Sequence, residues 1–393
     1  MGKKLGYVVF ATSLLLALNS CSNNNGALSS SGSAVMYLAT AGDAEVAAFN
    51  VNLGSGSLSS LTTGVSTGTS PVAMALSPLL SALFIANSNS NDISTYTVNS
   101  DGSLTAATAT TKVGTTPVAL AMDPAGKFLF VANQGSSDIS VFSVSGSTLT
   151  EVAGSPFTTI PAGQTDSTGP AGLVVSLTGN FLYVSNSTNG TVAVYSIDSS
   201  GVIAPSGPLY AVGTAPTGMT ITPGGPFLYV VNSGSNTVSA FSICDKVVAS
   251  CADPNNPDGR LTVIPGTAAN NAFAVGQSPV AVAANPSFAF LYVLNKGSNQ
   301  ISCFSYGSGT GVLTALTTPV VSTGTTPVSF VIVAGATGTN RGNTTTNPID
   351  YVYVANNGSS TITPFTLTTA TGVLAPFGTT ITTATNPSAI AAN

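Results

Sequence analysis

Residues 228–241 read Leu-Tyr-Val-Val-Asn-Ser-Gly-Ser-Asn-Thr-Val-Ser-Ala-Phe, and this stretch decides the fold. Two runs rich in β-branched and aromatic residues flank a polar turn, which predicts two antiparallel strands joined by a hairpin. The same unit recurs, so the chain is built from repeats. The strand before the turn occurs at 36–40, 83–87, 129–133, 182–186, 228–232, 291–295 and 352–356, and is the second strand of each blade counted from the axis. An aromatic residue marks the strand after the turn at Phe49, Tyr96, Phe142, Tyr195, Phe241, Phe304 and Phe365.

Two further markers complete each unit. A branched aliphatic residue opens an outer strand at Leu58, Leu104, Leu149, Ile203, Leu261, Leu313 and Leu374. A proline precedes an apolar run at Pro71, Pro117, Pro170, Pro216, Pro279, Pro327 and Pro387. The sequence therefore predicts an all-β fold, a seven-bladed β-propeller with four antiparallel strands per blade. Because the chain enters a blade at its second strand, we expect the C-terminal strand to pair in the first blade and close the ring.

The repeated Leu-Tyr-Val-x-Asn, followed by a Gly-Ser-Asn turn and an Ile/Val-Ser-x-Phe strand, resembles the YVTN-type repeats of the lactonase-like seven-bladed propeller family. The resemblance covers essentially all of 36–393. It implies the propeller architecture. For activity it leaves two possibilities open, because this family includes sugar-lactone hydrolases as well as many surface proteins without known catalysis.

The composition excludes several function classes. Hydrophobic residues make up 43% of the 393 residues, which rules out a disordered chain. Lys and Arg total 8 against 13 Asp and Glu, so we expect no nucleic-acid partner. Histidine is absent, which removes Ser-His-Asp hydrolysis and His-ligated zinc or haem. We expect no cofactor and no metal site.

The N-terminus predicts export. Lys3 and Lys4 precede a short apolar stretch, so 1–20 reads as a signal peptide. The stretch ends in Leu-Asn-Ser-Cys and resembles a bacterial lipobox, which implies lipidation of Cys21, although an ordinary secretory peptide is the alternative. We expect 21–35 to be a flexible tether, 36–393 the propeller, and the protein to be anchored by lipid at the cell envelope, on the outer membrane or cell surface.

The three remaining cysteines divide into two groups. Cys244 and Cys251 stand close together in a polar insertion of an exported chain, which favours a local disulfide. Cys303 lies within a strand-like run and is expected to be a small buried hydrophobe.

The candidate binding residues lie in hairpins and insertions. Asp92 and Asp138, together with Glu45, occupy one equivalent hairpin position, and either bind a cation or polyol or support the turn. Two insertions are expected to enlarge the face at the tunnel mouth: 151–169, with Gln164 and Asp166, and 264–278, with Asn270 and Asn271. Lys296 lies in another hairpin. The innermost strands contain no acid, base or cysteine, so no catalytic residue is assigned on the axis.

The main functional expectation is a non-catalytic module that binds a glycan, peptide or protein at the cell envelope. The alternative is hydrolysis of a sugar lactone or related ester, with Asp92, Asp138 or Asp166 activating water. A third possibility is a purely structural role, in which many propellers pave a surface. The sequence does not define the oligomeric state.

Overall fold

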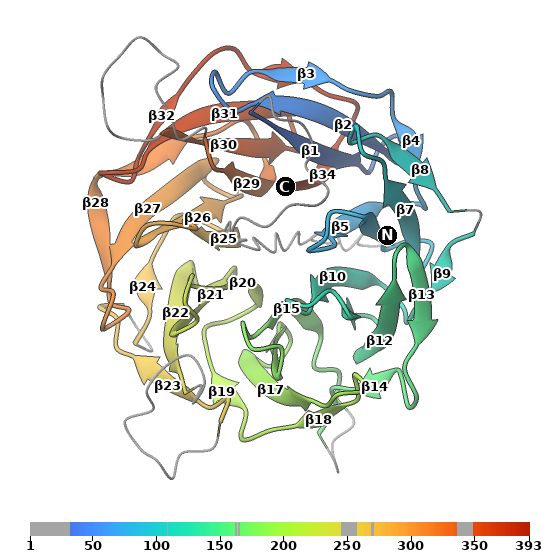
Figure 1. The fold of residues 1–393 in the computed structure, drawn as a ribbon. Coiled ribbons are helices and arrows are strands. Elements are labelled where there is room, and N and C mark those ends of the chain that lie inside the picture. The colour runs from blue at the N-terminus through green and yellow to red at the C-terminus, as the bar shows by residue number, and fades with distance from the viewer. Residues whose placement is uncertain are drawn as a thin grey trace, which may run out of the picture.

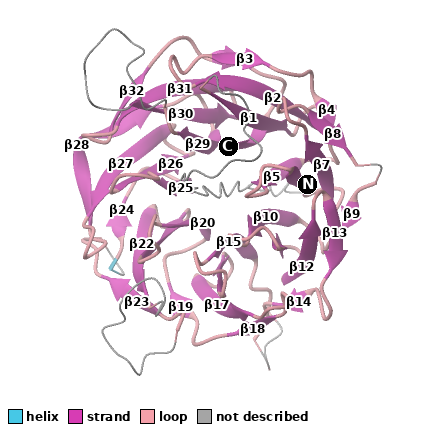
Figure 2. Ribbon diagram, viewed as in Figure 1, coloured by secondary structure: helices cyan, strands magenta, loops and turns pink. Residues whose placement is uncertain are grey.

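Seven antiparallel sheets surround a central axis in the computed structural model, which describes residues 32–107, 109–161, 163, 166–244, 258–268, 271–335 and 349–393 (Figure 1). Strands and loops make up nearly all of the described chain (Figure 2). No helix in these ranges is long and apolar enough to cross a membrane. The predicted seven-bladed propeller is confirmed.

The blades are numbered I to VII, and each runs from an innermost strand at the axis to a short outer strand. Blade I contains β34 (Pro387–Ala392), β1 (Ser33–Thr40), β2 (Glu45–Asn52), β3 (Leu58–Ser60) and β4 (Val65–Ser66). Blade II contains β5 (Pro71–Leu76), β6 (Ala82–Asn87), β7 (Asp92–Val98), β8 (Leu104–Ala106) and β9 (Thr111–Lys112). Blade III contains β10 (Pro117–Met122), β11 (Phe128–Asn133), β12 (Asp138–Ser145), β13 (Thr148–Glu151) and β14 (Phe157–Thr158).

Blades IV to VII repeat this order. Blade IV contains β15 (Pro170–Val175), β16 (Phe181–Asn186), β17 (Thr191–Ile197), β18 (Ile203–Pro205) and β19 (Tyr210–Ala211). Blade V contains β20 (Pro216–Ile221), β21 (Phe227–Asn232), β22 (Thr237–Ile243), β23 (Leu261–Ile264) and β24 (Phe273–Ala274). Blade VI contains β25 (Pro279–Ala284), β26 (Phe290–Asn295), β27 (Gln300–Tyr306) and β28 (Leu313–Ser322). Blade VII contains β29 (Pro327–Val333), β30 (Ile349–Asn356), β31 (Thr361–Thr368), β32 (Val373–Pro376) and β33 (Ile381–Thr382). In every blade except VI, the outer strand is broken into two short segments.

The repeated proline begins each innermost strand, where its missing N–H costs no ladder hydrogen bond. The residue before it has a positive φ in all seven blades, between 47° and 59°. These residues are Ser70, Thr116, Gly169, Ala215, Ser278, Thr326 and Asn386. The chain therefore makes the same turn, with one left-handed residue, before each of the seven innermost strands.

The apolar core lies between neighbouring blades. Seven clusters of buried side chains fill the seven interfaces among the described residues. Each draws on two adjacent blades, and the cluster between blades VI and VII also includes Ala171 of blade IV. The aromatic residue of the repeated Leu-Tyr-Val-x-Asn is fully buried in every blade, and large aromatic side chains contribute most to such a core. Adjacent blades are thus held together chiefly by face-to-face burial.

A tyrosine hydroxyl also joins blades at five of the seven interfaces. In each case the Tyr of the second strand donates to the carbonyl of a left-handed glycine in the next blade. The pairs are Tyr37–Gly102, Tyr183–Gly259, Tyr229–Gly311, Tyr292–Gly372 and Tyr353–Gly56, with O···O distances of 2.7–3.2 Å. Phe84 and Phe130 occupy the same position at the other two interfaces. We call this contact the tyrosine–glycine link.

The ring closes as predicted, because β34 pairs with β1 in blade I. The register places Met36 opposite Ala392 and Leu38 opposite Ile390. β1 begins at Ser33, three residues before the predicted start of the propeller at Met36, because Ser33 to Val35 pair with the end of β2. The predicted signal peptide 1–20 and the lipidation residue Cys21 lie outside the described residues.

Candidate functional site

One residue from each blade lies at the end of the ring where the innermost strands begin. This residue follows the second strand, and its backbone N–H donates to the carbonyl of the residue that precedes an innermost strand, at 2.8–3.0 Å. The seven residues are Ala41, Ser88, Gln134, Ser187, Ser233, Lys296 and Asn357. We call them the mouth ring. Because the same backbone bond holds every member, the side chains at these positions are presented at one level around the axis.

Polar side chains connect parts of the mouth ring. Gln134 Nε2 donates to Ser187 Oγ of the next blade at 3.2 Å, and Asn357 Nδ2 donates to the Pro387 carbonyl at 3.1 Å. Apart from Ala41, the mouth ring is therefore made of amide and hydroxyl side chains with a single formal charge.

Lys296 supplies that charge. Its side chain is half-buried, and its Nζ makes no hydrogen bond or ion pair with any residue that the structure describes. Burial lowers the pKa of the ammonium from its ordinary value, because removing water disfavours the charged form. A partly dehydrated amine without a protein partner is suited to a substrate oxygen that carries or develops negative charge.

Asp92 is committed to structural contacts. It is 4% exposed, and its carboxylate accepts hydrogen bonds from Asn87, Ser90, Thr110 and Lys112 at 2.8–3.2 Å. Burial alone would raise its pKa, but the four hydrogen bonds outweigh burial and lower it. A carboxylate with a lowered pKa is a weak base, so these contacts argue against Asp92 as the group that activates water.

The equivalent hairpin positions explain why an acid stands there. The buried Asn at the end of the second strand donates through Nδ2 to Asp92 in blade II and to Asp138 in blade III. In blades IV, V and VII it donates instead to Thr191, Thr237 and Thr361. An acid in two blades and a hydroxyl in three blades therefore accept the same hydrogen bond within the hairpin. This favours the alternative that Asp92 and Asp138 support the turn rather than bind a cation or polyol.

The two insertions differ in position. Between β14 and β15, the Ser167 hydroxyl bonds the Ser137 hydroxyl in the hairpin between β11 and β12, on the same face as the mouth ring. Asp166, next to Ser167, is exposed and makes no hydrogen bond within the described ranges. Gln164 of this insertion and Asn270 of the other lie outside the described residues. Asn271 lies between β23 and β24, at the outer edge of blade V, where its carbonyl accepts from Gly266 N. The second insertion therefore enlarges the outer edge rather than the mouth, because the broken outer strand resumes at β24 before the chain turns to the axis.

The cysteines offer no reactive or metal-binding group among the described residues. Cys244 is disulfide-bonded, and Cys251 lies outside the described residues. Cys303 is fully buried, and burial raises the pKa of its thiol to about 12, so it behaves as a hydrophobe. The described part of the chain contains no group of three His, Cys, Asp or Glu side chains that could hold a metal ion.

Sequence reasoning identified Lys296 but missed the rest of the mouth ring. Gln134 and Asn357 belong to it because each follows a repeat Asn directly. The side chain at that position ranges from Ala41 to Lys296, while the residue before it is Asn in six of the seven blades, and this contrast is the signal that could have identified it.

Comparison with solved structures places the fold among bacterial propellers. A putative 6-phosphogluconolactonase from Bacteroides uniformis is similar with a TM-score of 0.74 and 18% identity, over 92% of this chain and 100% of that chain. One from Bacteroides fragilis gives 0.73 and 19%, over 93% and 99%. A periplasmic gluconolactonase of Pseudomonas aeruginosa gives 0.68 and 18%, over 91% and 98%. At these identities the similarity shows the fold alone.

No curated protein matches the chain. The family described as "Lactonase, 7-bladed beta-propeller" matches residues 27–155, 148–247 and 244–391, which together span the whole ring. The family match backs the lactonase-like alternative and lends no support to a non-catalytic binding module. The chain belongs to the lactonase family of seven-bladed β-propellers.

Proposed function

We propose that this protein hydrolyses a lactone at the mouth ring. The observation that carries the proposal is Lys296, a half-buried ammonium without a protein partner in the described ranges, set in an otherwise uncharged rim. Membership in the lactonase propeller family supports the reaction class. The named neighbours, a putative 6-phosphogluconolactonase and a gluconolactonase, support a six-carbon sugar lactone as the first substrate to test.

In the proposed reaction, water adds to the ring carbonyl carbon and the carbonyl electron pair moves onto oxygen. Lys296 stabilises that oxyanion. The tetrahedral intermediate then collapses, the bond between the carbonyl carbon and the ring oxygen breaks, and the ring oxygen takes up a proton to give a hydroxy acid. A positive charge fixed in a partly dehydrated site stabilises this developing negative charge far better than water does.

A carboxylate would accept the proton of the attacking water. Asp92 is disfavoured by its four hydrogen bonds, and Asp138 is engaged with Asn133. Asp166 is the predicted acid whose carboxylate makes no hydrogen bond among the described residues, and it lies on the mouth face. We assign it the role of base in this scheme.

The test compares initial rates of ring opening for gluconolactone and its 6-phosphate. Lys296→Gln should lower kcat/KM by about 10²–10³, the usual cost of removing one oxyanion contact. Lys127→Gln is the matched control, because Lys127 is an exposed lysine at the start of β11 on the opposite face. Equal rates for the two variants would contradict the role of Lys296. Full activity in Asp166→Asn would remove the assigned base while leaving the reaction class intact.

We also propose that the protein is exported and lipid-anchored through Cys21 at the cell envelope. The support is the Leu-Asn-Ser-Cys sequence after a short apolar stretch. Metabolic labelling with a radioactive fatty acid should label the full chain, and Cys21→Ala should abolish the label. Labelling that persists in Cys21→Ala would contradict anchoring at this residue.

A further inference from the structure

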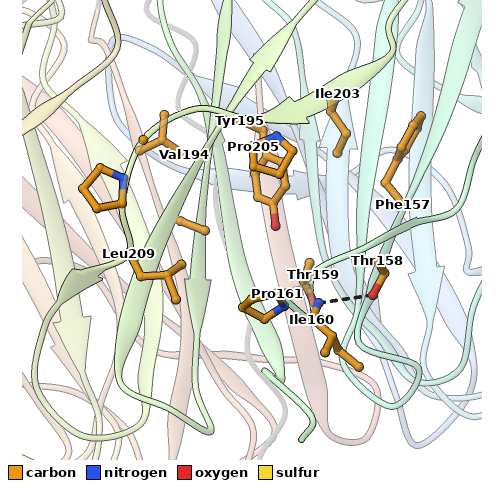
Figure 3. A pocket seen from close by; sticks show the side chains of 13 residues that line it. Phe157, Thr158, Thr159, Ile160, Pro161, Val194, Tyr195, Ile203, Pro205 and Leu209 are labelled. Carbon is orange, nitrogen blue, oxygen red and sulfur yellow. Dashed lines mark hydrogen bonds between the residues drawn. The ribbon is translucent and has the colours of Figure 1, made fainter. Parts of the chain in front are cut away.

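A pocket lies between blades III and IV, and none of the residues that line it belongs to the mouth ring (Figure 3). Its volume is about 520 Å³, within the range of roughly 300–1,000 Å³ that small-molecule sites occupy. One wall is 157–161 of blade III, and the other comes from 193–195, Ile203, Pro205 and 207–209 of blade IV. The pocket is therefore built by the outer strands of two neighbouring blades.

The next interface shows why space remains at this one. Between blades IV and V, Tyr210 of β19 packs edge-on against Phe241 of β22, with ring centroids 6.1 Å apart. The register places Phe157 of β14 where Tyr210 stands, and Tyr195 of β17 is the repeat equivalent of Phe241. Phe157 and Tyr195 make no such ring contact, so the gap that is closed between blades IV and V is open here.

Tyr195 presents its hydroxyl to this space. The residue is 5% exposed, and Figure 3 shows its hydroxyl pointing between Leu209 and Ile160. At the equivalent position of blade II, the Tyr96 hydroxyl donates to the Ser66 carbonyl at 2.6 Å. The Tyr195 hydroxyl has no hydrogen-bond partner in the part of the chain that the structure describes. Burial raises its pKa to about 12, so it remains a hydrogen-bond donor at neutral pH.

The two threonine side chains of the pocket each make a hydrogen bond of their own. Thr158 Oγ1 accepts from Ile160 N, and Thr159 Oγ1 donates to the Ser137 carbonyl. None of the lining residues is charged. An ionic ligand would therefore lose its hydration without compensation, whereas an apolar ligand would lose little.

We propose that this pocket binds an uncharged, largely apolar small molecule whose single carbonyl-type oxygen accepts a hydrogen bond from the Tyr195 hydroxyl. The pocket and the mouth ring are separate sites, so this inference stands independently of lactone hydrolysis. Apolar burial supplies the affinity, and the one hydrogen bond selects ligands with an acceptor over pure hydrocarbons.

Benzophenone and diphenylmethane form a matched pair of probes, because they differ only in the carbonyl. Binding of both to the full chain is measured by calorimetry. Tyr195→Phe should weaken benzophenone about two- to tenfold and leave diphenylmethane unchanged. Leu209→Asp should weaken both, since Leu209 forms a wall and is exposed enough to accept a charge. Leu177→Asp, an equally exposed leucine outside the pocket, should change neither.

Photolysis of bound benzophenone gives a second, independent result, because the excited ketone forms covalent bonds with neighbouring C–H groups. Mass spectrometry should place the adducts in 157–161 or 193–209. Adducts elsewhere, no binding up to the solubility limit, or an unchanged preference for benzophenone in Tyr195→Phe would each overturn the proposal.

Discussion

Tyr353→Phe tests whether the tyrosine–glycine link stabilises the closed ring. The Tyr353 hydroxyl donates to the Gly56 carbonyl at 2.7 Å, across the interface between blades VII and I. Tyr353 is fully buried, so water cannot replace the lost partner. The variant should lose about 1–3 kcal/mol in the free energy of unfolding, because it leaves a buried carbonyl without its hydrogen bond.

Two other blades show that a phenylalanine side chain packs at this position without the hydroxyl. Phe84 and Phe130 occupy the equivalent position in blades II and III and are fully buried. Tyr353→Phe should therefore remove a hydrogen bond with little change in packing. Tyr229→Phe should cost a similar amount, since its hydroxyl makes the same 2.7 Å contact with Gly311.

Equilibrium unfolding in urea measures the effect, with the m-value expected to stay constant. Tyr306→Phe is the control, because the Tyr306 hydroxyl makes no hydrogen bond among the described residues; its cost should stay within about 0.5 kcal/mol. If Tyr353→Phe and Tyr306→Phe lowered stability equally, the tyrosine–glycine link would make no measurable contribution to the stability of the closed ring.

Three more predictions concern stability. Gly56→Ala should destabilise by about 1–3 kcal/mol through overpacking, because the added Cβ would collide with the Tyr351 ring, and by more through its φ of +69°. Thermal unfolding against Gly378→Ala, where no atom lies near the added Cβ, measures this. Asp92→Asn should lower stability at pH 7, and its deficit should shrink as pH falls below the unfolded pKa of about 3.9 toward the lowered folded pKa of Asp92; a deficit that does not shrink below that pH would contradict this. Burial raises the pKa of Asp350, so its contribution to folding stability is full below the unfolded pKa, about 3.9, and is lost as pH rises through the folded pKa. The stability of wild type relative to Asp350→Asn should therefore fall with rising pH. A stability difference that stays constant between pH 4 and 8 would refute this prediction.

Much of the fold could be predicted because its markers are local. The prolines at 71, 117 and 170 begin innermost strands, since only strand entry tolerates a missing N–H at that point. The tyrosine–glycine link could not be predicted in the same way. It joins Tyr353 to Gly56, which stand 297 positions apart, and depends on how one blade docks on the next.

The candidate site was less accessible to sequence reasoning. Lys296 could be found because a charged residue in an uncharged hairpin stands out. The position of Asn271 could not be found, because the outer strand is broken and an insertion within it looks like one in the connection that follows. The pocket at Tyr195 was also missed, because it exists through the absence of a ring contact that the neighbouring interface makes.

Lactone hydrolysis is tested most directly by measuring whether the purified chain opens a lactone ring. Proton release from gluconolactone and its 6-phosphate should be followed at constant mildly acidic pH, where spontaneous hydrolysis is slow, and corrected for the rate without protein. Saturable turnover well above this background is expected, with kcat/KM lowered by about 10²–10³ in Lys296→Gln and retained in Lys127→Gln. A folded protein that adds nothing to the background rate for either lactone would contradict it.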